Sequence, residues 1–121
     1  MKKSVLVVED QEDNRRIMRD LLASGGYEVI EAVTGIEGVQ AAETHQPDLI
    51  LMDVQLPGID GYEATRRIKA NPALRQVPII IVTSYALSGD DIKAYEAGCD
   101  DYVAKPFSPR KLLEKIRGYL P

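Results

Sequence analysis

The stretch Leu49-Ile50-Leu51-Met52-Asp53-Val54-Gln55-Leu56-Pro57-Gly58 decides how the rest of the chain is interpreted. Its first four residues are apolar, which is typical of a strand buried on both faces of a parallel sheet. The apolar run ends at the carboxylate of Asp53, and the pair Pro57-Gly58 then favours a turn. A carboxylate at the end of a buried strand costs free energy unless a cation or hydrogen-bond donors compensate it. Ligands of open α/β sheets bind at that end of the strands, so Asp53 is the first candidate functional residue.

Apolar runs on both sides of this stretch predict four further strands, at residues 5–8, 27–32, 77–82 and 101–104. Helical spacing between the runs predicts five helices. Each is opened by capping residues, namely Asp10 or Asp13, Thr34, Asp60, the run 88–91, and Ser108.

The spacing also predicts which face of each helix is buried. In the first helix the inner face is expected to hold Ile17, Met18, Leu21 and Leu22, and the outer face Arg15, Arg16 and Arg19. In the fourth helix the inward residues are expected to be Ile92 and Ala97, and the outward ones Asp91 and Tyr95.

Strands that alternate with helices predict an α/β fold, with a parallel sheet covered on both faces and right-handed crossovers. For five strands in a chain of 121 residues we expect the flavodoxin-like, doubly wound order 2-1-3-4-5, with five helices. The three unbroken apolar strands would then take the central positions. The chain contains no linker and no low-complexity segment, so a single domain over residues 1–121 is expected.

The composition limits the classes of function. The formal net charge of −4 argues against a nucleic-acid partner, which would need a basic face. The apolar run after Met1-Lys2-Lys3 is too short for a signal peptide, and no run reaches the ~18 apolar residues of a membrane span. Cys99 is the only cysteine, which suits a reducing compartment. We therefore expect a cytoplasmic protein that binds neither membrane nor nucleic acid.

Polar side chains follow the predicted strands where these end at one edge of the sheet. They are Glu9 and Asp10 after the first strand, Asp53 after the third, Thr83 and Ser84 after the fourth, and Lys105 after the fifth. Crowded carboxylates raise each other's pKa unless a cation compensates them, and Mg²⁺ prefers carboxylate and phosphate oxygens. The hydroxyl and the ammonium remain to neutralise an anion attached to Asp53. Since aspartate can be a covalent acceptor, these residues favour phosphoryl transfer to Asp53.

Four motifs carry a resemblance to a known family. In chain order they are Val8-Glu9-Asp10, Leu-Met-Asp-Val-Gln-Leu-Pro-Gly-Ile-Asp-Gly at 51–61, Val-Thr-Ser-Tyr-Ala at 82–86, and Lys-Pro-Phe at 105–107. Over essentially its whole length the chain resembles the receiver domain of two-component response regulators. We expect the stand-alone, single-domain type found among cell-cycle and chemotaxis regulators, because no further segment follows the last predicted helix.

The resemblance implies a phosphorylatable switch. Asp53 would accept a phosphoryl group from a phosphohistidine of a sensor histidine kinase or a histidine phosphotransfer protein. The switch would then signal through changed protein contacts or pass the phosphoryl group on. It would be no enzyme beyond its own phosphotransfer and autodephosphorylation.

The resemblance also implies roles for the neighbouring residues. Mg²⁺ would be bound by Asp10, Asp53 and the backbone carbonyl of Gln55, and through water by Glu9. Thr83 and Lys105 would contact phosphoryl oxygens, with a cis peptide bond from Lys105 to Pro106.

Further residues would sense the phosphorylated state or set its lifetime. Tyr102 would turn inward and change the face made by the fourth helix, the last strand and the last helix, where a downstream protein would bind. Ser84 would leave room for the phosphoryl group, while Gln55 and Tyr85 stand where residue identity tunes dephosphorylation. Tyr95 is expected beside Tyr102 in a partner-binding patch, since tyrosines favour interfaces. A monomer or a weak dimer is expected.

Other interpretations depend on particular positions. An acid after a strand is often only a helix cap, Glu9 could be a solvated acid beside the pocket, and Tyr95 an ordinary surface residue. A phosphohydrolase of the haloacid dehalogenase type would need an acid two residues after Asp53, where Gln55 stands. A flavodoxin-like cofactor binder or a nucleotide-binding module would need a glycine-rich loop after the first strand, and the sequence has none there. A receiver-like domain that is never phosphorylated would not need the complete set of acids, hydroxyl and lysine.

Overall fold

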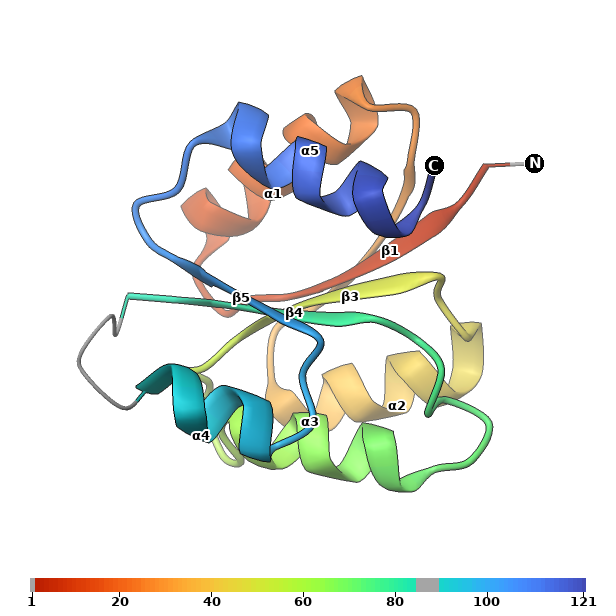
Figure 1. Cartoon of the computed structure of the whole chain (residues 1–121), viewed down its shortest axis with the longest axis vertical. Coiled ribbons are helices and arrows are strands. Elements are labelled where there is room, and N and C mark those ends of the chain that lie inside the picture. Colours follow the sequence, from red (N-terminus) through yellow and green to blue (C-terminus); the bar gives the residue numbers. More distant parts are fainter. Residues whose placement is uncertain (1, 85–89) are drawn as a thin grey trace.

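The computed structural model describes residues 2–84 and 90–121, in which strands and helices alternate (Figure 1). The strands are β1 (Ser4–Val8), β2 (Glu28–Ala32), β3 (Leu49–Asp53), β4 (Ile79–Thr83) and β5 (Asp101–Ala104). The helices are α1 (Glu12–Ser24), α2 (Gly35–His45), α3 (Gly61–Ala70), α4 (Asp90–Glu96) and α5 (Pro109–Tyr119). Across these described ranges, no helix has the length and apolar character needed to cross a membrane. The predicted alternation is confirmed.

The strands form one parallel sheet in the order β2-β1-β3-β4-β5, as predicted. In register, Val8 of β1 lies opposite Met52 of β3, and Asp53 of β3 lies opposite Val82 of β4. The unbroken apolar strands β1, β3 and β4 are therefore central. Because all strands run the same way, the residues that directly follow β1, β3, β4 and β5 meet at one edge of the sheet, away from both chain termini in Figure 1.

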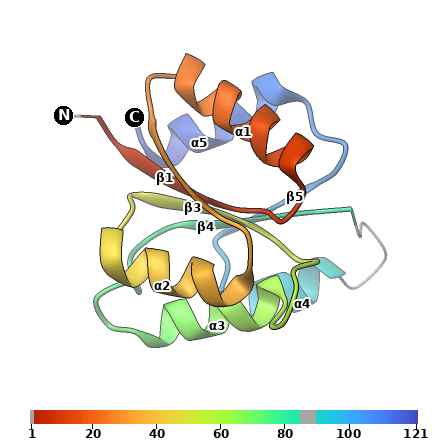
Figure 2. The same cartoon turned by 180° about the vertical axis from the view of Figure 1, so that it is seen from behind.

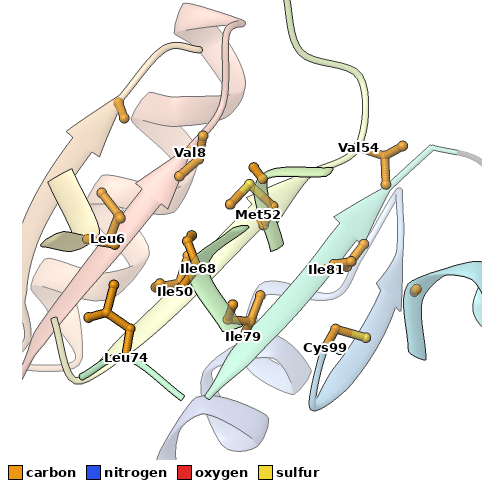
Figure 3. Close-up of a cluster of buried hydrophobic side chains, with 14 residues drawn as sticks. Leu6, Val8, Ile50, Met52, Val54, Ile68, Leu74, Ile79, Ile81 and Cys99 are labelled. Atoms are coloured by element: carbon orange, nitrogen blue, oxygen red, sulfur yellow. The ribbon is translucent and has the colours of Figure 1, made fainter. Parts of the chain in front are cut away.

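Helices α1 and α5 cover one face of the sheet, and α2, α3 and α4 cover the other (Figures 1 and 2). Successive strand residues point to opposite faces, so each central strand contributes to two apolar clusters. Figure 3 shows the cluster of buried side chains between the sheet and α2–α4. Ile50 and Ile79 of the sheet belong to it together with Ile68 of α3. On the other face Leu51 packs in the same cluster as Met18 of α1. Burial on both faces explains why the sequences of these strands are unbroken apolar runs.

The predicted helix caps are confirmed in three helices and wrong in one. A side-chain oxygen accepts a hydrogen bond from the backbone N–H three residues later in α2, α3 and α5, from Thr34, Asp60 and Ser108. Helix α1 instead begins after Gln11, whose side chain makes no capping hydrogen bond. Asp10 precedes that position, and Asp13 lies within the first turn, where its charge still favours the helix N-terminus. The run 88–91 lies partly outside the described residues.

In α1 and in α4, one predicted inward residue of each helix is exposed. The buried residues of α1 are Met18 and Leu22, four apart, and Ile17 is rotated away from them and 50% exposed. In α4 Ala94 is buried, as is Ala97 directly after the helix, whereas Ile92, two positions before Ala94, points away and is 58% exposed. The buried stripe of each of these helices is therefore narrower than the apolar spacing in the sequence indicated.

Candidate functional site

Three carboxylates gather where β1 and β3 end. Glu9 and Asp10 follow β1, and Asp53 is the last residue of β3. Each offers an oxygen atom within 4.8 Å of the others. Glu9 and Asp53 are buried, with 0% and 6% of their surface exposed, and Asp10 is half-buried. The convergence predicted from the strand ends is therefore present.

Lys105, after β5, supplies the cation that faces these acids. Its Nζ lies 2.7 Å from Glu9 Oε1 and 3.6 Å from Asp53 Oδ1. Its backbone N–H donates to the carbonyl of Thr83, at 2.7 Å, which ties the end of β5 to the end of β4. The Lys105-Pro106 peptide bond is cis, as the resemblance implied.

The two buried carboxyl groups are affected differently by this cation. Burial, and next the negative charge of Glu9, raise the pKa of Asp53 to about 7, against the attraction of Lys105 and the N–H of Val54. Burial also acts to raise the pKa of Glu9, but the hydrogen bonds from Lys105 and from the Gln11 N–H outweigh it and lower that pKa. Of these two groups, Asp53 is thus the one whose negative charge is less compensated, and a bound cation would compensate it.

An open pocket of about 510 Å³ lies over these groups. It is lined by Asp10, Gln11, Asn14, Asp53, Gln55, Leu56, Ser84 and Lys105. Carboxylate and carbonyl oxygens with room for water are the donors that Mg²⁺ prefers, so this set fits that ion.

The remaining predicted residues surround the pocket or lie beyond it. Thr83 is fully buried at the end of β4, and Ser84 is exposed in the pocket wall. Tyr102 of β5 is half-buried and packs against the apolar cluster of Figure 3. Tyr95 of α4 is 50% exposed. Tyr85 lies outside the described residues.

The loop between β3 and α3 is closed tightly against the site by Gly61. The Gly61 N–H donates to the Val54 carbonyl, at 2.9 Å. A Cβ atom at position 61 would lie 2.0 Å from the Asp53 carbonyl oxygen, so only glycine allows this approach. Gly61 therefore fixes the path of the chain from Asp53 through Gln55.

Arg15 contacts the loop that carries Glu9 and Asp10, and the sequence did not identify this contact. The spacing predicted Arg15 on the outer face of α1, but its side chain is only 13% exposed and reaches the loop after β1. The sequence signal for this contact is an arginine one turn into the first helix with an acid opposite it in β2. That signal can be used only once the pairing of β1 with β2 is known.

Comparison with known proteins gives the family. The family model for the response regulator receiver domain matches residues 5–117. The chain belongs to this family. It is 44% identical, over 99% of its length and 98% of the relative, to the polar-differentiation response regulator DivK of Brucella ovis.

Solved structures agree with this assignment. The receiver domain of the sensor histidine kinase PA1611 from Pseudomonas aeruginosa, solved with a magnesium ion coordinated in its active site cleft, is 41% identical. Its TM-score is 0.92, and the match covers 99% of this chain and 98% of that one. A CheY-like receiver domain protein from Methanospirillum hungatei is 35% identical with a TM-score of 0.90, covering 99% and 94%.

The chain is therefore a receiver domain of the two-component type, a phosphorylatable signalling switch rather than a classical enzyme. Receiver domains take phosphoryl groups from histidine kinases and act on downstream partners.

Proposed function

We propose that Asp53 is the phosphoacceptor of this receiver domain, with Mg²⁺ as the required cofactor. The observation that carries the proposal is the placement of Asp53, a buried carboxylate open to a pocket, 3.6 Å from the Lys105 ammonium and beside two further acids. The donor is a phosphohistidine of a sensor histidine kinase or a histidine phosphotransfer protein.

In the transfer, a carboxylate oxygen of Asp53 forms a bond to phosphorus while the phosphorus–nitrogen bond to the donor imidazole breaks. The imidazole nitrogen leaves with the electron pair of that bond. Asp53 must be ionised to attack, and its pKa of about 7 in the metal-free site means that added positive charge favours the reactive form.

Mg²⁺, when bound, neutralises charge on the phosphoryl oxygens and on the acids around them. Asp10, Asp53 and the Gln55 carbonyl would hold it directly, and Glu9 through water. The PA1611 receiver domain, solved with a magnesium ion coordinated in its active site cleft, supports the choice of this ion.

Lys105 and Thr83 would contact the phosphoryl oxygens as a cation and a hydrogen-bond donor. The Lys105 ammonium already lies between Glu9 and Asp53, so a small movement would bring it to a phosphoryl oxygen. The Thr83 hydroxyl would donate to another oxygen, and Ser84 leaves space beside it. Gln55, and Tyr85 outside the described residues, would tune hydrolysis of the acyl phosphate, which makes autodephosphorylation part of the proposal.

The donor protein is proposed to approach over α1 and the segment that follows β5. A second pocket of about 490 Å³ adjoins the site there and shares Asn14, Ser84 and Lys105 with it. Its remaining walls are Ile17, Pro106, Phe107 and Pro109, and the exposed Ile17 is an apolar contact next to the acceptor.

The output is proposed to be protein binding on the face of α4, β5 and α5. Asp101 of β5 accepts hydrogen bonds from Lys115 and Tyr119 of α5, so a movement of β5 would be passed to α5. Tyr95 and Tyr102 would respond to phosphorylation as part of this face. Beyond the site around Asp53, chemical-shift changes on adding acetyl phosphate and Mg²⁺ should therefore extend to α4, β5 and α5.

The proposal also covers the location, the oligomeric state, the domain organisation and the partner classes of the protein. A cytoplasmic location, a monomer or weak dimer, a single domain over residues 1–121, and no nucleic-acid or membrane partner remain predictions.

Incubation with acetyl phosphate and Mg²⁺, followed by intact mass measurement, tests the central claim. The wild type should gain one phosphoryl group, and Asp53→Asn should gain none. Asp20→Asn, which changes an exposed acid on α1, is the matched control and should behave as the wild type. An unmodified wild type, or an adduct on Asp53→Asn, would overturn the proposal.

A further inference from the structure

The guanidinium of Arg15 joins three parts of the fold beside the candidate metal site. Arg15 lies in α1, one turn after the loop that carries Glu9 and Asp10. Its Nη1 donates to the Glu9 carbonyl at 2.9 Å and is 3.5 Å from the Asp10 carbonyl. Its Nε donates to Glu31 of β2 at 3.1 Å. The side chain therefore links α1 and β2 to the backbone of both acids.

These loop carbonyls lie beyond the regular ladder of the sheet. The Glu9 N–H still pairs with the Ala32 carbonyl, at 3.0 Å, but β1 ends at Val8. The guanidinium of Arg15 is a side-chain donor that reaches both loop carbonyls. A backbone held through its carbonyls keeps both side chains in place, with Asp10 in the pocket wall and Glu9 buried against Lys105.

The acids around Arg15 hold the guanidinium in turn. Glu31 and Glu12 both pair with it, and the Arg15 side chain is 13% exposed against 37% for Arg19 and 57% for Arg16. A planar guanidinium has several donors in a fixed geometry, so it can bind two acids and a carbonyl at once.

We infer that Arg15 is a positioning residue for the metal site: its guanidinium fixes the β1–α1 loop so that Glu9 and Asp10 are held in a binding arrangement. This inference rests on the proposed magnesium site. Partners that orient metal ligands without touching the metal commonly have large effects on affinity.

Arg19 provides a matched control. It pairs with the same two acids, Glu31 at 2.9 Å and Glu12 at 3.9 Å, but its described contacts include no carbonyl of the loop. Arg15→Met and Arg19→Met each remove one positive charge from α1. Loss of that charge alone would strengthen the binding of a cation, whereas loss of the loop contacts would weaken it.

The test is a titration with Mg²⁺ alone, followed by backbone amide chemical shifts. We expect Arg15→Met to bind Mg²⁺ about tenfold more weakly, the low end of the usual effect of such partners. Arg19→Met should bind at least as tightly as the wild type. Arg15→Lys keeps the charge without the planar fork and should be intermediate.

Amide hydrogen exchange of the metal-free protein gives a second measurement that does not depend on activity. The Gln11 N–H donates to Glu9 Oε2 at 3.1 Å, so its exchange reports the order of the loop. It should be faster in Arg15→Met and unchanged in Arg19→Met.

The outcomes separate this inference from the proposed function. A wild type that shows no Mg²⁺-dependent shifts around Asp53 would refute the proposed site itself, and with it the role of Arg15. A wild type that binds Mg²⁺ while Arg15→Met binds equally well, with unchanged Gln11 exchange, would overturn only the role of Arg15. Should Arg15→Met fail to fold, wild-type affinity in Arg15→Lys would overturn the claim that the fork is needed.

Discussion

Replacing Asp53 with Asn should stabilise the metal-free protein, and the magnitude follows from the pKa of the buried carboxyl group. Burial and the Glu9 carboxylate raise that pKa from 3.8 to about 7. As the pH rises above about 4, the unfolded chain loses this proton first, which favours unfolding. The penalty grows until the folded group also ionises, near pH 7. The whole difference corresponds to about 4 kcal/mol, since one pKa unit is worth about 1.36 kcal/mol.

Asparagine removes the charge and keeps an oxygen that can accept from the Val54 N–H, a hydrogen bond of 2.8 Å in the wild type. It also loses the attraction of Lys105, which reduces the gain. We therefore expect an increase of about 2–4 kcal/mol in the free energy of unfolding at pH 8, and little change at pH 4.

Urea unfolding in EDTA across this pH range measures the effect. The matched control is Asp13→Asn, because the Asp13 side chain is 84% exposed and its pairing with Arg16 should contribute under ~0.5 kcal/mol. An Asp53→Asn protein no more stable than the wild type at pH 8 would refute the reasoning. A gain of equal size at pH 4 and pH 8 would refute its electrostatic cause.

Three other substitutions, all in α3, test how this helix is packed. Gly61→Ala should cost about 1–3 kcal/mol in urea unfolding and weaken Mg²⁺ binding in a titration, because the new Cβ displaces the Asp53 carbonyl; wild-type values for both would contradict the close approach. Lys69→Met should lower the free energy of unfolding by about 1–3 kcal/mol, because Nζ donates to the Val77 carbonyl at 2.7 Å and to Asp100 at 2.9 Å. Thr65→Val should raise it by about 1 kcal/mol, because the buried Thr65 hydroxyl has no hydrogen-bond partner among the described residues; a loss in thermal melting would count against this.

The sheet was predictable from the sequence because its signal is local and strong. The run at 49–52 is apolar without interruption, and burial on both faces is the simplest reason for such a run. The helix caps at Thr34 and Asp60 are likewise local, since each cap bonds to a backbone N–H three residues away. The exposed Ile17 and Ile92 were not predictable in this way, because the width of a buried stripe depends on the neighbour that covers it.

The residues of the candidate site also differ in whether the sequence alone could predict them. Glu9, Asp53 and Lys105 could be brought together in advance, because parallel strands place their ends at one edge. Arg15 could not, since its role depends on which acid of β2 stands opposite α1. The resting contact of Lys105 with Glu9 also needed coordinates, because the sequence alone gave no reason to prefer Glu9 over Asp53.

The resting contact of Lys105 with Glu9 affects how the site binds a cation. One ammonium serves two buried carboxylates, 2.7 Å from Glu9 and 3.6 Å from Asp53, and Asp53 remains under-compensated with its pKa at about 7. Any cation that needs ionised Asp53 must therefore bind more weakly as the pH falls below 7, since protons compete for the same group. Conversely, saturating Mg²⁺ should restore much of the stability that Asp53 costs, and the advantage of Asp53→Asn should shrink as the metal is added. The free energy that the under-compensated Asp53 costs is thus what makes the site responsive, because a fully compensated Asp53 would gain little from cation binding.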